Sequence, residues 1–327
     1  MSAGLRAPPR GRGRLTRGHL PPRPMLATLS ADIPAGPEWV FEEKYDGIRA
    51  LAVRENGAVR LYSRSLQDLT GGFPYSVAAV AALPHGELIL DGELVALDEK
   101  GISRFQLLQR RGAAGARRTR YAVFDLLKLG GRSLLTRPLL ERRAALERLI
   151  GRRAGPIFLA RRLVRDGKAA YREAKRHGWE GIIAKDEGSS YEPNTRSRAW
   201  RKVKIRKESE FVIGGYTPPA GSREHLGALL VGLYRGRALI FVGKVGTGFT
   251  RATLRDLGER LAALRREDSP FADEVRERSA TWVEPRLVAQ IGFSEWTPDG
   301  RLRHPRFLGL REDKDPRDVV REKARPR

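Results

Sequence analysis

The segment Trp39-Val-Phe-Glu-Glu-Lys-Tyr-Asp-Gly-Ile-Arg-Ala-Leu-Ala-Val53 decides the fold of the first half of the chain. It is rich in β-branched and aromatic residues, and Asn56-Gly57, a pair typical of a tight hairpin turn, follows it. Val59-Arg-Leu-Tyr-Ser63 then supplies the return strand. The sequence between 38 and 65 therefore predicts strand, turn and strand, with a lysine inside the first strand.

Lys44 is unusual because it lies among acidic residues within an apolar strand. Burying an ammonium group is costly unless the group is paired or neutralised. Two interpretations are open at this point: Lys44-Tyr-Asp-Gly-Ile-Arg49 is either an exposed edge strand with solvated charges or the carrier of a nucleophilic amine. An amine pKa near ~10.4 is too high for attack at neutral pH, so the second interpretation requires nearby cations that lower it.

Cations of that kind occur later in the chain. Trp200-Arg-Lys-Val-Lys204 places Lys202 and Lys204 on one face of a predicted strand, since residues i and i+2 point the same way. Such a pair could contact a phosphate and hold Lys44 partly neutral. A solvated surface is the alternative interpretation of two spaced lysines.

Acidic residues interrupt two short apolar runs, at 88–97 and 121–127, which we expect to be buried strands that present acids to a site. Asp91-Gly-Glu93 lies in the first run, and Glu180 precedes a third apolar stretch. Carboxylate oxygens are the ligands that a hard cation such as Mg²⁺ prefers. Each acid alone is equally compatible with a salt bridge in the core.

The remaining periodicities predict how the chain is organised. Helical spacing occurs at 139–150 and at 169–177, where Gly178 supplies a stop signal. Beyond Lys204, short apolar runs predict strands at 211–216, 229–234, 238–245 and 287–296, with one helix marked by Leu254, Leu257, Leu261 and Leu264. Such a series fits a small barrel of the OB type. We therefore expect a flexible basic arm at 1–23, one domain at 24–205 and a second at 206–327.

Charge and composition limit the class of protein. The chain has 327 residues, with 63 Lys and Arg against 39 Asp and Glu, and a formal net charge of +24. It contains no cysteine, which excludes a disulfide scaffold, a thiolate zinc site, an iron–sulfur cluster and a cysteine nucleophile. No apolar run approaches the ~20 residues of a membrane span. We expect an intracellular protein with a polyanionic partner; an arginine-biased composition without a partner is the alternative.

Taken in order, six motifs resemble the signature set of the covalent nucleotidyltransferases, which are the ATP-dependent DNA ligases, the RNA ligases and the mRNA capping enzymes. The six are Lys44-Tyr-Asp-Gly-Ile-Arg49, Ser63-Arg-Ser65, Asp91-Gly-Glu93, Phe124-Asp125, Glu180-Gly-Ile-Ile-Ala-Lys185 and Lys202-Val-Lys204. The resemblance implies an α+β nucleotidyltransferase (adenylation) domain with antiparallel sheets and flanking helices, followed by an all-β OB-fold domain.

Within that superfamily the chain is most similar to ATP-dependent DNA ligases, in particular the ligase module of the bacterial end-joining ligases called ligase D and ligase C. Five further stretches carry this likeness: Pro24-Met25, Phe105-Gln-Leu-Leu-Gln-Arg110, Gly243-Lys-Val-Gly-Thr-Gly-Phe249, Glu295-Trp-Thr297 and the segment from Arg303 to Lys314. Asn194 departs from the pattern, since relatives tend to have glycine there. This departure concerns a loop conformation and not the activity.

The resemblance implies roles for residues around the nucleotide. Lys44 would attack the α-phosphate of ATP and become a lysyl–AMP phosphoramidate. Glu42 would read the adenine amino group, and Phe124 would stack on the purine ring. Arg49 and Arg64 would contact ribose and phosphate, or the 5′-phosphate of a nick, through their bidentate guanidinium groups.

Two further sets of residues follow from the same resemblance. Glu93 and Glu180 are the expected carboxylates of a divalent metal site, for Mg²⁺ or Mn²⁺. The cations that would neutralise the α-phosphate as charge builds there are Lys185, Lys202 and Lys204. The residues that would orient the departing pyrophosphate are Arg311, Asp313 and Lys314.

The implied activity is ATP-dependent sealing of 3′-hydroxyl/5′-phosphate nicks or joined ends, in DNA repair and non-homologous end joining. The expected cofactors are ATP and a divalent metal. The expected partners are nicked or broken duplex DNA and a Ku-like end-binding protein, with the chain acting as a monomer in the cytoplasm, at the bacterial nucleoid. An RNA ligase, a capping-type nucleotidyltransferase and a catalytically decayed DNA-binding OB protein are the alternatives.

Overall fold

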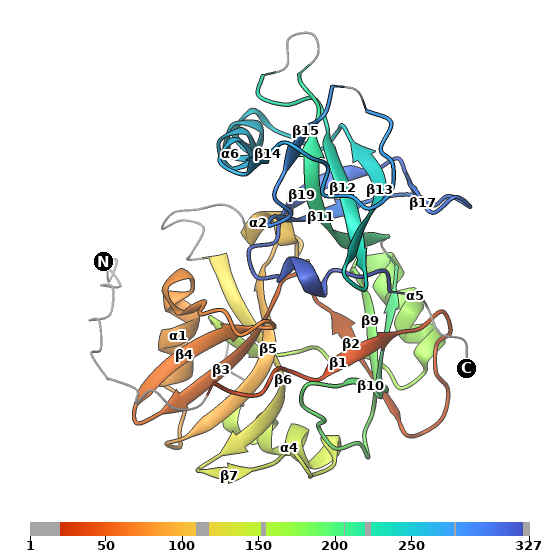
Figure 1. Cartoon of the computed structure of the whole chain (residues 1–327). Helices are drawn as coiled ribbons and strands as arrows, with labels where there is room; N and C mark the ends of the chain where they lie inside the picture. Colours follow the sequence, from red (N-terminus) through yellow and green to blue (C-terminus); the bar gives the residue numbers. More distant parts are fainter. Residues whose placement is uncertain are drawn as a thin grey trace. The chain divides into compact units, whose positions relative to one another are not determined.

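The computed structural model describes residues 20–108, 118–151, 155–205, 207–219, 224–277 and 279–322. The described residues form two compact units, the first extending to Val203 and the second beginning at Lys204 (Figure 1). No helix among the described residues is long and apolar enough to cross a membrane. Most of the expected basic arm, residues 1–19, lies outside the described residues, as do Gln109 and Arg110 of the Phe105 motif.

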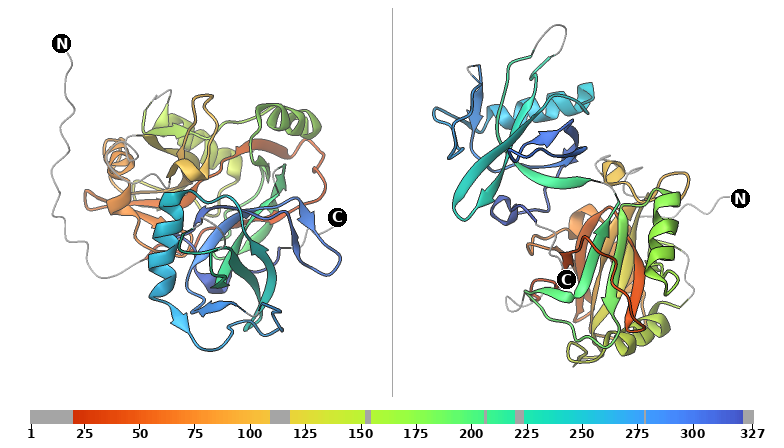
Figure 2. Two further views of the ribbon diagram at one scale, coloured as in Figure 1. Left: turned by 90° about the horizontal axis from the view of Figure 1, so that it is seen from above. Right: turned by 90° about the vertical axis from the view of Figure 1, so that its right-hand side faces the viewer.

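A four-stranded sheet forms one layer of the first unit, in the order β1-β10-β9-β2. Its strands are β1 (Leu26–Leu29), β10 (Arg196–Lys204), β9 (Gly181–Asp186) and β2 (Trp39–Lys44). Helix α5 (Gly167–His177) packs against β9 and β2 on the outside of this sheet (Figure 2). The helix ends at Gly178, whose φ of 67° confirms the stop that the sequence predicted.

A second sheet of the first unit runs in the order β4-β3-β5-β6-β7, with β8 parallel to β6. Helices α1 and α4 cover one of its faces, where Ala52, Leu90 and Val123 of the sheet pack against Val80 and Leu146 of the helices. The elements are β3 (Ile48–Glu55), β4 (Ala58–Ser63), η1 (Thr70–Gly72), α1 (Pro74–Ala81), β5 (Leu88–Ala96), α2 (Phe105–Leu108), β6 (Thr119–Leu129), β7 (Arg132–Ser133), α4 (Leu139–Ile150) and β8 (Ile157–Leu159).

The segment that the sequence predicted as one strand forms two strands in two different sheets. β2 ends at Lys44 and β3 begins at Ile48, so the chain changes sheets between them. A Cβ on Gly47 would overlap the carbonyl oxygen of Leu94, so only glycine fits this crossover. The hairpin that follows is confirmed, with positive φ at Asn56 (49°) and Gly57 (76°).

The two sheets of the first unit are joined by a shared apolar cluster and by a short segment. The cluster contains Met25, Leu51, Leu127, Tyr191 and Trp200, which come from both sheets and the loops beside them. The segment is 160–163. Its residues accept a hydrogen bond from the Glu43 N–H and donate one to the Phe41 carbonyl, both on β2. They also donate a hydrogen bond to the Val123 carbonyl on β6. The backbone itself therefore ties the two layers together.

The second unit is built mainly of strands. Strand β11 (Glu208–Tyr216) pairs with β12 along one edge and with β15 and β16 along the other. The remaining elements are β12 (Leu229–Arg235), β13 (Ala238–Val245), α6 (Arg251–Ala262), β14 (Arg265–Arg266), β15 (Thr281–Val283), β16 (Val288–Gly292), β17 (Glu295–Trp296), β18 (Leu302–Arg303), β19 (Arg306–Leu310) and η2 (Pro316–Asp318).

The sequence predictions for this unit are confirmed in most places. Helix α6 buries Leu254, Leu257 and Leu261, as their spacing predicted. The strand expected at 287–296 is wrong in its length, because β16 ends at Gly292 and a separate ribbon of β17 and β18 follows. The aromatic residues at 293 and 296 pack on Phe211 instead of continuing the strand.

Candidate active site

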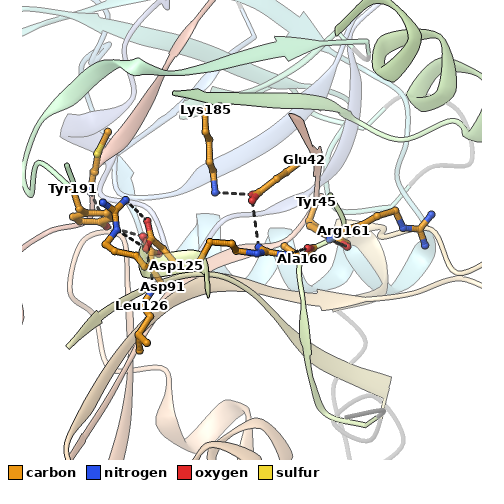
Figure 3. A network of polar contacts seen from close by, with 12 residues as sticks. Glu42, Tyr45, Asp91, Asp125, Leu126, Ala160, Arg161, Lys185 and Tyr191 are labelled. Atoms are coloured by element: carbon orange, nitrogen blue, oxygen red, sulfur yellow. Dashed lines mark hydrogen bonds and ion pairs between the residues drawn. The ribbon is translucent and has the colours of Figure 1, made fainter. Parts of the chain in front are cut away.

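Strand alternation places the candidate nucleotide residues of the first unit on two facing surfaces. On the four-stranded sheet, Glu42 lies opposite Ile183 and Val40 opposite Lys185, so Glu42, Lys44 and Lys185 share one face. The other face carries Phe41 and Glu43 and is covered by α5. In Figure 3, Glu42 and Lys185 point toward Asp91 and Asp125 of the second sheet.

Lys44 forms an ion pair at the end of β2. Its Nζ lies 2.5 Å from Oε2 of Glu180, and 18% of the lysine side chain is exposed. Burial lowers the pKa of Lys44, but Glu180, with smaller contributions from Glu93 and Asp46, raises it, and the net direction is upward. The lowered pKa that the sequence suggested is therefore wrong for this structure, because the groups acting on the amine are carboxylates.

Glu42 is buried between two cations. Its Oε2 lies 2.6 Å from Nζ of Lys185, and its Oε1 lies 3.3 Å from Nη1 of Arg143 on α4 (Figure 3). The Lys185 ammonium also lies 4.4 Å from the ring centre of Phe124 and 4.3 Å from that of Trp200. The structure thus brings together three residues that the sequence assigned to the nucleotide, Glu42, Phe124 and Lys185.

Arg49 is held by Asp91, which thus forms the core salt bridge that the sequence left open as the alternative to a metal ligand. Both oxygens of the fully buried Asp91 accept from Arg49 at 2.5 Å, and Tyr191 donates to the same carboxylate at 2.6 Å. The guanidinium lies 4.6 Å from the ring centre of Phe124, and it also donates to the Met25 carbonyl. Arg49 is thereby fixed beside Phe124, and its contact with a nucleotide stays a prediction.

Two carboxylates stand near the amine of Lys44 and could hold a divalent cation. Glu180 contacts the amine directly, and Glu93 raises the pKa of the same group. Among the described residues no set of three or more metal-ligating side chains is found. Mg²⁺ is usually bound through one or two carboxylates together with substrate phosphates and water. The donor set of Glu93 and Glu180 fits a cation of that kind and does not fit an all-protein metal cage.

Three other residues that the sequence assigned to the nucleotide lie in the turn after β4 and in β10. Arg64 is half-buried in the turn that follows β4. Lys202 lies in β10 opposite Leu29 of β1, and the Lys204 amine donates to the carbonyl oxygen of Glu208 at 2.8 Å. Their contacts with phosphate remain predictions.

The predicted pyrophosphate residues form their own cluster in the second unit. Arg311 donates to both oxygens of Asp313, at 2.9 and 2.8 Å, and Lys314 lies 3.1 Å from Glu210. Asp313 is buried, and although burial raises its pKa, Arg311 lowers it and the net direction is downward. The three residues are therefore brought together, with Asp313 held ionised.

Glu43 points away from these groups, toward α5. Its carboxylate is 2% exposed and lies 3.6 Å from Arg161. Burial raises the pKa of Glu43 to about 7, while Arg161 and Tyr45 oppose the shift and Glu173 adds to it. The acid next to Lys44 is therefore a buried group of the opposite face.

Sequence reasoning missed two arginines of helix α4. Arg142 is fully buried and forms two hydrogen bonds of 2.8 Å with Asp125, and Arg143 contacts Glu42. A signal for both was present: they lie three and four residues after Leu139 and before Leu146, on the apolar face of the helix. Charged residues on a buried face require partners, and these partners are residues of the site.

Comparisons with known proteins agree with this arrangement. Residues 24–204 match the family model of the ATP dependent DNA ligase domain, and residues 222–314 match that of the ATP dependent DNA ligase C terminal region. The multifunctional non-homologous end joining DNA repair protein LigD of Mycobacterium tuberculosis is 42% identical over 305 residues, which are 91% of this chain and 40% of that protein. The DNA ligase of Thermococcus fumicolans is 35% identical over 335 residues, 91% of this chain and 57% of that protein.

Two solved structures are similar over nearly their whole length. A mycobacterial DNA ligase D complexed with ATP and MES has a TM-score of 0.68 and 40% identity, covering 92% of this chain and 98% of that one. The ligase domain of M. tuberculosis LigD has a TM-score of 0.52 at the same identity and coverage. The chain spans about 40% of the length of the mycobacterial relatives that it matches.

Proposed function

The chain belongs to the ATP-dependent DNA ligase family, and from this membership we propose that it seals breaks in duplex DNA at the expense of ATP. Its fold class is the one expected from the sequence, a nucleotidyltransferase domain followed by an OB-fold-like domain. The observation that carries the proposal is the position of the Lys44 amine, beside Glu180 and on the same sheet face as Glu42 and Lys185.

In the first step the amine of Lys44 attacks the α-phosphorus of ATP. The ammonium of Lys44 first gives its proton to water or to the adjacent Glu180 carboxylate, and the amine then turns its lone pair away from Glu180 toward the phosphorus. A nitrogen–phosphorus bond forms, the bond from the α-phosphorus to the bridging oxygen breaks, and pyrophosphate leaves. The product is lysyl–AMP. In-line displacement at phosphorus depends mainly on positioning and on neutralising charge.

The buried side chains around Glu42 and Phe124 in the first unit would hold the adenosine part of ATP. Phe124 offers an aromatic face for the purine, and the Glu42 carboxylate offers an acceptor to the adenine amino group. An acceptor at this place favours adenine over guanine, which supports a ligase over a capping guanylyltransferase. The ligase D structure that is similar to this chain was solved with ATP.

Cations would surround the phosphates. Lys185 is the candidate nearest to Glu42, and Lys202 and Lys204 follow on β10. A divalent metal held through Glu93 and Glu180 would supply further positive charge at the phosphates. Arg311, Asp313 and Lys314 of the second unit would orient the departing pyrophosphate, with Asp313 fixing the Arg311 guanidinium.

The later steps would use DNA. AMP passes from Lys44 to the 5′-phosphate of a nick, and the 3′-hydroxyl then displaces AMP as the strand is sealed. A net charge of +24 supports a polyanionic substrate, whose binding should weaken steeply with salt. The relatives named for non-homologous end joining support double-strand break repair at the bacterial nucleoid as the setting. A Ku-like protein is the proposed recruiting partner.

The test is a covalent labelling assay followed by a sealing assay. The full chain is incubated with α-labelled ATP and a divalent metal and then run on a denaturing gel. The unchanged chain should carry label and should seal a nicked duplex. Lys44→Ala should do neither, whereas Lys168→Ala, which changes an exposed lysine on α5, should do both. Label on the Lys44→Ala chain, or no label on the unchanged chain, would overturn the proposal.

A further inference from the structure

Beside Glu42 lies a cation, Arg143, to which the proposed ligase reaction gives no role. Arg143 extends from α4 to the Glu42 carboxylate, and the two side chains are each 4% exposed. Glu42 has a second cationic neighbour, Lys185, on its other oxygen. The other contacts of these two cations indicate which of them remains with Glu42 when a nucleotide is bound.

Lys185 is the closer of the two cations to Glu42, but this contact lacks hydrogen-bond geometry. Its Nζ lies 2.6 Å from Oε2 of Glu42 but meets no acceptor with hydrogen-bond geometry among the described residues. Burial lowers the pKa of Lys185 in spite of Glu42 and Asp125, so its charge is incompletely compensated where it lies. The ammonium also lies 4.4 Å from the ring centre of Phe124, so a purine stacked on that side of the ring would displace it.

Arg143, in contrast, is held by three separate acceptors. It donates to Oε1 of Glu42 at 3.3 Å, to the Ala160 carbonyl at 2.6 Å and to Oε1 of Glu147 at 3.1 Å. Ala160 begins the segment 160–163 that ties the two sheets together. The neighbouring Arg142–Asp125 pair anchors the same helix to β6. Arg143 is therefore held beside Glu42 by two further acceptors that do not involve Lys185.

We propose that Arg143 is the positioning residue that sets the base specificity of this chain, by holding the Glu42 carboxylate in place as a hydrogen-bond acceptor. An ionised carboxylate only accepts hydrogen bonds, so it pairs with the 6-amino group of adenine and repels the 6-oxo group of guanine. Arg143 leaves the buried Glu42 carboxylate with a positively charged partner, and fixes its orientation, after Lys185 has moved. This inference rests on the proposed function, because it assumes that ATP occupies the pocket.

The experiment compares ATP and GTP in the covalent labelling assay with the full chain. In Arg143→Gln, we expect the ratio of kcat/KM for ATP to that for GTP to fall roughly 10- to 100-fold, the range that one hydrogen bond to a charged group supports. The matched control is Arg148→Gln, which makes the same change at an exposed position of α4 and should leave the ratio unchanged. Arg143→Lys, which keeps the charge, should recover part of the ratio.

A double-mutant cycle separates a positioning role from a general loss of structure. If Arg143 acts through Glu42, Arg143→Gln should change the ATP/GTP ratio little in a Glu42→Gln background. Thermal unfolding of each variant reports whether the chain is folded. An unchanged ratio in a folded Arg143→Gln chain, or equal effects in both backgrounds, would overturn the inference. Failure of the unchanged chain to take label from ATP would instead refute the proposed function.

Discussion

The amine of Lys44 lies 2.5 Å from the Glu180 carboxylate, so the candidate nucleophile is held as one half of an ion pair. The pairing raises the pKa of Lys44 despite its burial, which keeps the amine protonated and unreactive in this arrangement. Attack therefore requires that Glu180 release the amine, and phosphates or a divalent metal are the charges that could draw these two groups apart.

Lys44→Arg should abolish covalent labelling by ATP while leaving the fold intact. Arginine keeps a positive charge opposite Glu180 but does not lose its proton at working pH, so it cannot act as a nucleophile. The measurement is label on a denaturing gel beside a thermal unfolding curve. Lys168→Arg on the exposed face of α5 is the control. Label on a folded Lys44→Arg chain would contradict the assignment.

Glu43→Gln should remove a pH dependence from the stability of the protein. The pKa of Glu43 is about 7 in the folded chain against an ordinary value of 4.5. Between these pH values the folded state binds more protons than the unfolded state. The stability that comes from this protonation is fully present below the lower pKa and is lost as the pH rises through the higher one. Relative to Glu43→Gln, the unchanged chain should lose roughly 3 kcal/mol of unfolding free energy from pH 5 to pH 8.

This difference is measured by urea unfolding of both chains at several pH values. Glu141→Gln, at an exposed position paired with Arg137, is the control and should not alter the pH profile. Parallel profiles for Glu43→Gln and the unchanged chain would show that Glu43 is ionised throughout. The groups acting on Glu43 are Arg161, Tyr45 and Glu173, so each of these must be left unchanged in the comparison.

Arg142→Met should destabilise the protein by about 3–5 kcal/mol, the cost of leaving a buried carboxylate without its partner. Arg142 and Asp125 are both fully buried and share two hydrogen bonds, and Arg142 also donates to the carbonyls of Arg137 and Ser189. Asp125→Asn combined with Arg142→Met should be less destabilising than the arginine change alone. Equal losses of stability for the single and double variants would show that the cost does not come from the unpaired Asp125 carboxylate.

Lys314→Gln should slow the reaction with ATP but spare the final sealing step. If Lys314 orients pyrophosphate, its loss should lower the rate of labelling by roughly 10²-fold, in the range seen when one charge-stabilising donor is removed. Sealing of a nick that already carries AMP produces no pyrophosphate and should change little. Arg317→Gln, a stacking residue on Tyr234, is the control. Equal losses in both reactions would show that Lys314 acts on DNA or on folding.

The sequence predicted individual elements well where a local signal existed. The strands β5 and β13, the helices α4 and α6 and the turn at Asn56-Gly57 follow from periodicity and turn chemistry. The division of the predicted first strand into β2 and β3 did not follow, because the apolar pattern continues across the break. The requirement for glycine at 47 comes from the Leu94 carbonyl on another strand, which no local pattern reveals.

In the candidate site, too, contacts between distant parts of the chain could not be predicted from the sequence. Lys44, Phe124 and Lys185 were assigned because they belong to motifs, and Glu42 because it lies two residues before the first motif. The partners that hold them, Arg143 for Glu42 and Asp91 for Arg49, depend on contacts between residues distant in the chain. The upward pKa of Lys44 also depends on Glu180, which is 136 positions away. Motifs therefore identified the reactive groups, whereas their charge states required the fold.

The backbone hydrogen bonds of the segment 160–163 predict which ATP analogues can react with Lys44. It is hydrogen-bonded to β2 beside Glu42 and to β6 beside Phe124, so the strands that carry the proposed base-reading and base-stacking residues are joined by main-chain bonds. We expect these bonds to resist the separation of the two strands that a bulky substituent on the adenine amino group would require. We therefore expect the protein to discriminate against larger bases, and N6-alkylated ATP to compete poorly with ATP for reaction with Lys44.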